Sequence, residues 1–359
     1  MPEARVIPLH AEGTEGGRRP RPRPAPRRAS RPGVGSLAER TAAARGTTVG
    51  RDQDTGEAGE TGVAPTGGEV AALPTPQGPT ELEARVAEVG EFLQRRLTGR
   101  YAVDDFGFDR DLTENVVMPV LRPLYEHWFR VETIGTENVP LSGGALLVAN
   151  HSGTLPLDAL MTTVAAHDDL PVPRYLRMLA ADLVFGLPGV GAVARKAGHT
   201  LACNADAEAL LSAGELVGVW PEGFKGIGKD FADRYKLQRF GRGGFVSAAL
   251  RTGVPIVPCS IVGAEEIYPK IADLGPLARL LGFPYFPITP TWPLLGPLGL
   301  VPLPSKWYIE FGEPIPTDVY DPGAADDPML VFNLTDQVRE NIQQTLYRLL
   351  AGRRNAFLG

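Results

Sequence analysis

Three short, mainly apolar segments constrain the fold more than any other feature of this sequence. They occupy residues 143–150, 216–223 and 254–263, and each is bounded by glycine or by a polar turn. Runs of this length are typical of strands that are buried on both faces of a sheet. Segments with helical spacing lie between them, at 155–167 and 243–253. This alternation predicts an α/β fold with a central, mostly parallel or mixed sheet flanked by helices.

The N-terminal part of the chain has a different composition. Residues 1–80 contain no aromatic residue and are rich in Pro, Gly, Ala and Arg. Such a segment cannot bury enough apolar surface to offset the entropy lost on ordering. We therefore expect a disordered tail over 1–78. Its arginine cluster at 18–31 is either solvated or an electrostatic tether for anionic lipid.

The rest of the sequence, 79–359, is expected to form one domain. Apolar residues at helical spacing predict an amphipathic helix over 81–97. Pro119 and Pro123 should kink the helix that follows. The expected parts are N-terminal helices over 81–130, an α/β core over 131–320 and a C-terminal helix over 333–353.

Cysteine content and charge exclude several classes of protein. Cys203 and Cys259 form neither a disulfide framework nor a metal-ligand pattern, which is typical of a reducing cytosol. The net charge of -6 argues against nucleic acid as the main partner. No apolar run reaches the roughly 20 residues of a membrane span, and no export segment follows the paired arginines at 18–19. We expect a cytoplasmic protein without a metal site.

The loop after the first apolar run carries the most chemical information. It places His151 directly after the expected strand and Asp158 in the first turn of the next helix. A histidine can take a proton from an alcohol because its unperturbed pKa is about 6.5. A carboxylate on the other ring nitrogen would hold the useful tautomer. Alternatively, Asp158 is an acid favoured by the helix dipole, and His151 is a hydrogen-bonded loop residue.

Three further blocks follow this loop in a fixed order. The four blocks are Asn150-His151 with Asp158, GVGAVAR ending at Arg195, Pro221-Glu222-Gly223, and Ile256-Val257-Pro258. In this order they resemble the glycerolipid acyltransferase family, which includes lysophosphatidate and monoacylglycerol acyltransferases. The resemblance covers roughly residues 130–315. Six residues separate His151 from Asp158, whereas four are usual in the family, so the sequence is more similar to a bacterial branch with an NHSG…D motif.

The resemblance implies an O-acyltransferase of phospholipid biosynthesis. Such an enzyme moves a fatty acyl group from acyl-CoA or acyl carrier protein to a hydroxyl of lysophosphatidate, another lysophospholipid or monoacylglycerol. It implies His151 as general base and Asp158 as its orienting acid, with no cofactor beyond the acyl donor. Backbone N–H groups around Gly223 are candidates for the oxyanion hole. The residues implied in substrate binding are Asn150, Arg195, Glu222, Gly223 and Lys225.

Several alternatives remain open at this level. Arg195 and Lys225 are either ligands of the acceptor or solvated surface residues. The glycine-rich turn 239–245 is either an anion site at a helix N-terminus or a turn that needs glycine. The acceptor could be a lipid without glycerol, or the chain a non-catalytic, membrane-associated scaffold of the same fold. A serine hydrolase is disfavoured because no Gly-x-Ser-x-Gly motif occurs.

Residues 280–305 form an uncharged segment rich in proline and aromatic residues. Its prolines exclude a continuous membrane-spanning helix. The segment could cover the core, line an acyl channel or lie in the lipid interface, where aromatic rings are favoured. The lipid substrates favour the last interpretation. We therefore expect peripheral contact with the inner face of the cell membrane.

Overall fold

The computed structural model describes residues 81–359, without the side chain of Glu81. These residues belong to a compact unit that spans Leu73–Gly359. The tail predicted over 1–78 and its arginine cluster lie outside the described residues, so both stay predictions.

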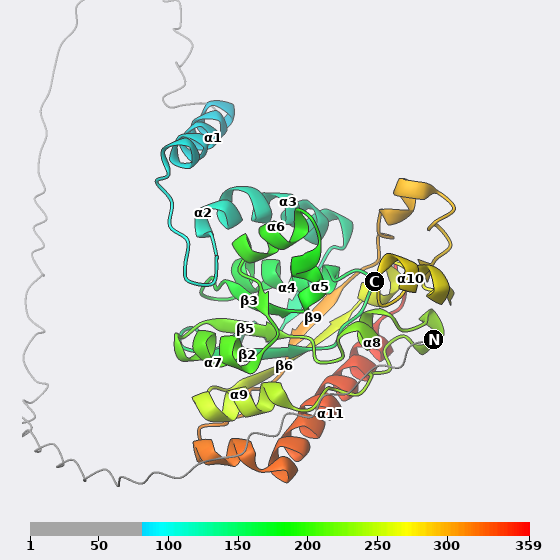
Figure 1. Ribbon diagram of the computed structural model, residues 1–359. Helices are drawn as coiled ribbons and strands as arrows, with labels where there is room; N and C mark the ends of the chain where they lie inside the picture. Colours follow the sequence, from blue (N-terminus) through cyan, green and yellow to red (C-terminus); the bar gives the residue numbers. More distant parts are fainter. Residues whose placement is uncertain (1–80) are drawn as a thin grey trace, which may run out of the picture. The chain divides into compact units, whose positions relative to one another are not determined.

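A seven-stranded mixed sheet forms the centre of this unit (Figure 1). The strand order is β1-β9-β6-β2-β5-β3-β4. The run from β6 to β4 is parallel, whereas β9 pairs antiparallel with β6 and parallel with β1. The structure thus confirms the predicted α/β fold with a mostly parallel, mixed sheet. The strands are β1 (Glu132–Ile134), β2 (Ala145–Ala149), β3 (Leu176–Ala180), β4 (Thr200–Leu201), β5 (Leu216–Val219), β6 (Ile256–Val262) and β9 (Tyr308–Phe311).

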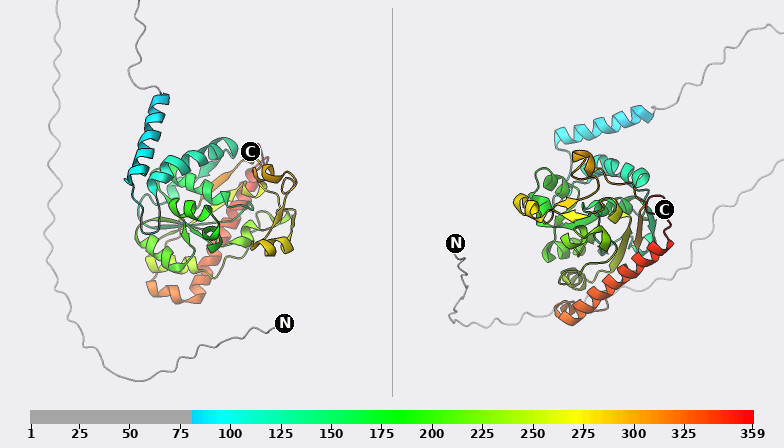
Figure 2. Two further views of the ribbon diagram at one scale, coloured as in Figure 1. Left: turned by 45° about the horizontal axis from the view of Figure 1, so that its top comes forward. Right: turned by 90° about the vertical axis from the view of Figure 1, so that its right-hand side faces the viewer.

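The three apolar runs become the central strands β6, β2 and β5. Every residue of β2 is buried, because helices cover both faces of the sheet. Leu147 faces a core that includes α4 (Leu157–Asp168) and the helical segment before β1. Leu146 faces a second core, which includes α7 (Asn204–Ser212), α9 (Gly244–Thr252) and α11 (Pro328–Gly352). Figure 2 shows α11 as a long red helix along this side of the domain.

Local sequence explains where these helices begin and end. Gly243 and Gly253 flank α9 and both adopt left-handed backbone conformations, which glycine permits without strain. Asp327 caps α11 by accepting hydrogen bonds from the N–H groups of Met329 and Leu330. For this reason α11 begins five residues before the helix predicted over 333–353.

The N-terminal helices lie near their expected positions. The predicted amphipathic helix is α1 (Glu81–Thr98), and Arg96 joins its C-terminal end to Asp109 through two hydrogen bonds. The next helical segment runs from α2 (Arg110–Leu112) through α3 (Met118–Pro123), with π-helical turns at Thr113–Val117 and Leu124–Trp128. Proline lacks the N–H group that a regular helix needs, which accounts for the irregular hydrogen bonding around Pro119 and Pro123.

The uncharged segment 280–305 forms an excursion between β6 and β9. It contains the end of α10 (Gly275–Leu281) and β8 (Pro287–Ile288), which pairs with β7 (Ala272–Asp273). Leu280, Leu294 and Leu298 are 72–82% exposed, so most of this segment does not cover the core. No helix among the described residues is long and apolar enough to span a membrane.

Several elements had no clear signal in the sequence. The short strands β1, β3 and β4 are among them because they contain charged residues or are only two or three residues long. The unpredicted helices are α5 (Asp182–Gly186), α6 (Val190–Lys196), α7, α8 (Phe224–Ile227) and α10; the 3-10 turns are Thr136–Asn138, Phe231–Asp233, Ala264–Glu266, Gly296–Leu300 and Pro322–Asp326.

Candidate active site

The structure brings His151 and Asp158 together at the carboxyl end of β2. Nδ1 of His151 lies 2.7 Å from Oδ2 of Asp158, whose side chain is fully buried. The ionised carboxylate can only accept, so Nδ1–H is the donor and Nε2 keeps its lone pair. The imidazole is 13% exposed, and no described residue binds Nε2. This arrangement suits a general base whose tautomer is fixed by a carboxylate.

The longer His–Asp spacing is accommodated by the backbone of the intervening loop. Gly153 has φ 94° and Thr154 has φ 65°, so two successive residues adopt positive φ. This tight reversal returns the chain to His151 before α4 begins. Asp158 then accepts two more hydrogen bonds, from the N–H of Ser152 at 2.9 Å and from its neighbour Ala159 at 2.8 Å. Six intervening residues therefore do not separate the pair.

Glu222 holds the backbone of the candidate base. Its Oε1 accepts a hydrogen bond from the N–H of His151 at 2.9 Å. Its Oε2 accepts one from the N–H of Gln238 at 2.6 Å. Since the residue is 4% exposed and both oxygens are engaged, Glu222 positions the loop. The direct contact with the acceptor that the sequence implied stays a prediction.

A buried lysine stands between Glu222 and a second carboxylate. Nζ of Lys229 lies 3.0 Å from Glu265 and 3.6 Å from Glu222, and the lysine side chain is 5% exposed. Burial raises the pKa of the Glu265 carboxyl to about 7, although Lys229 acts in the opposite direction. One cation thus compensates two buried acids beside the candidate base. Sequence patterns do not reveal this cluster because its members come from separate blocks.

Close packing beside His151 depends on a glycine. A Cβ atom at Gly226 would lie 2.7 Å from the carbonyl oxygen of His151 and 2.9 Å from its Cβ. Only glycine lets α8 approach the backbone of His151 this closely. On another side, the Trp220 ring centroid lies 6.0 Å from that of His151. The sequence analysis did not identify Gly226 or Trp220, although both lie in or beside the Pro-Glu-Gly block.

Asn150 has a structural position. Its side-chain amide donates to the carbonyl of Ile261 at 3.0 Å and accepts from the N–H of Ile261 at 2.7 Å. The residue is fully buried. Asn150 therefore ties the end of β2 to β6 and fixes the point from which His151 projects.

The remaining predicted substrate ligands lie in more open positions. Arg195 is an exposed residue of α6 whose guanidinium stacks over Phe185 at 4.6 Å. None of its described contacts involves His151. Lys225 is exposed, and no described carboxylate pairs with it. The N–H of Gly223 donates to the carbonyl of Trp220 at 3.0 Å, so this group is engaged and its proposed use as an oxyanion donor requires that bond to open.

Cys259 is the buried thiol closest in sequence to the blocks of the candidate site. Cys259 is fully buried, and burial together with nearby Asp158 raises its pKa far above the usual range. Within residues 82–359, no group of three His, Cys, Asp or Glu side chains is placed to hold a metal ion.

Close relatives of this chain occur in mycobacteria. The Mycobacterium tuberculosis protein Rv0502 is 64% identical over 281 residues, which is 78% of each chain. The Mycobacterium leprae protein ML2427 is 63% identical over 280 residues, covering 78% of this chain and 76% of its own. The crystal structure of the 1-acyl-sn-glycerophosphate (LPA) acyltransferase PlsC from Thermotoga maritima is similar at 20% identity with a TM-score of 0.47. That match covers 76% of this chain and 93% of the other.

A family model matches the part of the chain that carries the site. The Acyltransferase model covers residues 130–262, which include His151, Asp158, Arg195 and Glu222. This range contains all four sequence blocks and the strands β2, β5 and β6 that position them. The match confirms the family that the blocks predict, and this chain belongs to the acyltransferase family.

Proposed function

We propose that this protein is an O-acyltransferase that uses His151 as its general base and a glycerolipid as its acceptor. The observation that carries the proposal is the contact of His151 with the buried carboxylate of Asp158, which leaves Nε2 unpaired. The donor is a thioester of CoA or of acyl carrier protein. The acceptor is lysophosphatidate, another lysophospholipid or monoacylglycerol.

The proposed reaction is a direct transfer of the acyl group from the thioester to the acceptor. Nε2 of His151 removes the proton of the acceptor hydroxyl while the hydroxyl oxygen attacks the thioester carbonyl. The tetrahedral intermediate collapses, the C–S bond breaks and the new C–O ester bond remains. The leaving thiolate takes the proton back from the imidazolium, which Asp158 stabilises meanwhile. One ester and one free thiol result, and no acyl-enzyme is needed.

A thiol-release assay tests the proposal with the purified full chain. Acyl-CoA and the acyl thioester of acyl carrier protein are each combined with lysophosphatidate, another lysophospholipid or monoacylglycerol, and the ester is identified by mass spectrometry. We expect acceptor-dependent release of thiol with an equal amount of new ester. Thiol release without an acceptor would indicate a hydrolase. If no donor–acceptor pair gives a product, the chain is better interpreted as a non-catalytic scaffold of the same fold.

Membrane contact is part of the proposal. The excursion between β6 and β9 presents an apolar patch, which we define as Leu280, Leu294, Leu295, Leu298 and Val301. All five side chains are at least half exposed. A large exposed apolar surface often marks a site of interaction with a partner or a membrane. A lipid interface fits because the substrates are lipids, and a peripheral position on the inner face of the cell membrane gives access to cytoplasmic donors.

The excursion that carries the apolar patch also contacts the loop that follows His151. The hydroxyl of Tyr285, which lies in the same excursion, donates to the carbonyl of Thr154. Thr154 is one of the positive-φ residues that return the chain to His151. A bilayer that binds the patch would therefore hold the acceptor close to the candidate base.

Replacing Leu294, Leu295 and Leu298 by serine should weaken binding to phospholipid vesicles. Burying a leucine contributes about 1.5–3 kcal/mol, so losing three partly inserted side chains should cost at least about tenfold in partition coefficient. The melting temperature should stay within a few degrees, since these side chains are exposed. Vesicle cosedimentation measures the effect, with Val319→Ser (71% exposed, outside the patch) as control. Equal binding by the triple variant and wild type contradicts the proposed contact.

A further inference from the structure

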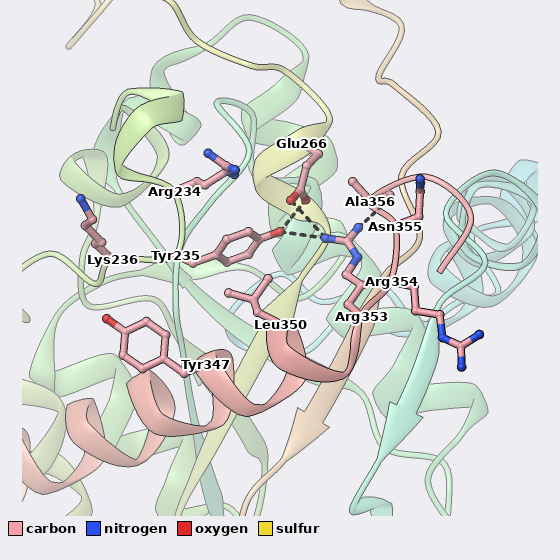
Figure 3. A pocket seen from close by; sticks show the side chains of 10 residues that line it. All are labelled: Arg234, Tyr235, Lys236, Glu266, Tyr347, Leu350, Arg353, Arg354, Asn355 and Ala356. Carbon is pink, nitrogen blue, oxygen red and sulfur yellow. Dashed lines mark hydrogen bonds and ion pairs between the residues drawn. The ribbon is translucent and has the colours of Figure 1, made fainter.

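A polar pocket lies between the end of α11 and the loop that follows α8 (Figure 3). Its volume is about 420 Å³, which is within the usual range for small-molecule sites. The residues that line it include four basic side chains and one carboxylate: Arg234, Lys236, Arg353, Arg354 and Glu266.

The charges at the floor of this pocket neutralise one another. Oε1 of Glu266 lies 3.1 Å from Nη1 of Arg353, and Oε2 accepts a hydrogen bond of 2.5 Å from the hydroxyl of Tyr235. Arg353 and Glu266 are 4% and 7% exposed. The only carboxylate of the lining is therefore occupied, and Nε of Arg353 is buried without a partner among the described residues.

The rim of the pocket carries uncompensated positive charge. Arg234, Lys236 and Arg354 are exposed. Within residues 82–359, Arg234 and Arg354 have no carboxylate at ion-pair distance, and the pair of Lys236 with Asp233 at 3.1 Å is solvent-exposed and therefore weak. Figure 3 shows Lys236 and Arg354 on opposite sides of the pocket. Cations placed around one pocket attract phosphate, which guanidinium and ammonium groups bind through charge-assisted hydrogen bonds.

The pocket has an aromatic and apolar wall in addition to its charge. Tyr347 and Leu350, one turn apart on α11, form this wall (Figure 3). The Tyr347 side chain is 57% exposed, so its ring is available to a ligand. Aromatic rings stack on nucleobases, and basic residues beside them bind the attached phosphates. This combination favours a phosphorylated nucleoside over a bare phosphate.

The pocket and His151 lie at the same edge of the sheet. His151 follows β2, and Glu266 follows β6, its parallel neighbour. One chain segment connects the two places. It leaves the active site at Lys229, which contacts Glu222, lines the pocket at 234–236, and returns at Gln238, whose N–H binds Glu222. In acyl-CoA a long pantetheine arm separates the thioester from the phosphorylated adenosine, so the two ends of the donor must bind at separate but adjacent places.

We propose that this pocket binds the phosphorylated adenosine of an acyl-CoA donor. The inference rests on the proposed acyltransferase function and selects CoA over acyl carrier protein, which has no adenosine. Arg234, Lys236 and Arg354 bind the phosphates, and Tyr347 stacks on the base. The acyl-thioester end extends along segment 229–238 towards His151.

Calorimetry with adenosine 3′,5′-bisphosphate and the full chain tests binding without requiring activity. Arg354→Glu and Lys236→Glu should each weaken binding about tenfold or more, because each replaces attraction by repulsion at the phosphates. Arg339→Glu, on α11 but outside the pocket, is the control and should bind like wild type. Unchanged affinity in both pocket variants overturns the proposal. Loss of binding in Arg242→Glu alone would instead place the anion site at the glycine-rich turn before α9.

Two further arms separate this proposal from its alternatives. Inorganic phosphate or glycerol phosphate that binds as tightly as the bisphosphate would indicate a headgroup or free-anion site and overturn the nucleotide assignment. In the transfer assay, Arg354→Glu should raise KM for acyl-CoA about tenfold at unchanged kcat. KM for the acyl-pantetheine donor, which lacks the nucleotide, should not change. Specific bisphosphate binding by a protein that transfers no acyl group would support the pocket and reject the proposed function.

Discussion

His151→Ala should lower turnover of the acyltransferase about 100-fold or more, because a positioned general base contributes roughly that factor at least. The variant loses the imidazole, whose Nε2 has no partner among the described residues and can accept the acceptor's proton. Thiol release at saturating acceptor and donor measures the effect. The fold should persist, since the imidazole is partly exposed and its backbone N–H, which binds Glu222, is unaffected.

His167→Ala is the matched control for this experiment. His167 also has a carboxylate beside its ring, with Nδ1 2.6 Å from Oδ1 of Asp168. It lies at the far end of α4 from the catalytic loop. The variant should keep wild-type turnover. Near wild-type turnover in His151→Ala, with the protein shown to be pure, would remove His151 as the base.

Lys229→Met should be the most destabilising single change near the site. The substitution leaves Glu222 and Glu265 buried without their shared cation, and removing one partner of a buried pair costs about 3–5 kcal/mol. Denaturant unfolding at pH 8 measures the free energy of unfolding. Lys225→Met is the control because Lys225 is exposed and unpaired within the described chain, so its effect should stay within about 0.5 kcal/mol.

The loss of unfolding free energy in Lys229→Met, which we call its deficit, should depend on pH through Glu265. The folded-state pKa of this carboxyl is raised from 4.5 to about 7. Protonation therefore favours the folded state below about pH 4.5, and this contribution is lost as the pH rises to 7. Without Lys229 the ionised carboxylate is less tolerated, so the deficit should grow between pH 5 and pH 8. A deficit that is the same at both pH values, or below 1 kcal/mol, contradicts the proposed charge balance.

Activity separates the positioning role of Lys229 from a purely structural one. Glu222 should lose its fixed position when the lysine is removed, which would disturb the backbone of His151. We expect a lower kcat with little change in KM, measured where the variant remains folded. Lys229→Met combined with Glu265→Gln should recover stability because one of the two uncompensated charges is removed.

The sequence by itself determined the central strands and the place of the candidate base. The strands β2 and β5 contain only apolar residues, and Ser260 is the one polar residue of β6. Short apolar runs of this kind are typical of strands that are buried on both faces. His151 follows β2 directly, so local order places it at the carboxyl edge of the sheet. The alternation of strands and helices then restricted the architecture to a mostly parallel α/β fold.

Contacts between distant segments were decided only by the tertiary structure. The spacing of His151 and Asp158 left their contact open, because it depends on the positive φ values of Gly153 and Thr154. Glu222 binds the N–H of His151 across 71 residues of sequence. The antiparallel pairing of β9 with β6 is likewise non-local.

The basic pocket shows the same limit most clearly. It joins residues 234–236 to residues 347–356, and each segment alone reads as ordinary charged surface. A charge pattern shows how many charged residues one segment carries, whereas a pocket forms only where two segments meet in the folded chain. Sequence therefore determined which residue types were present near the site, and packing of the chain decided which of them face one another.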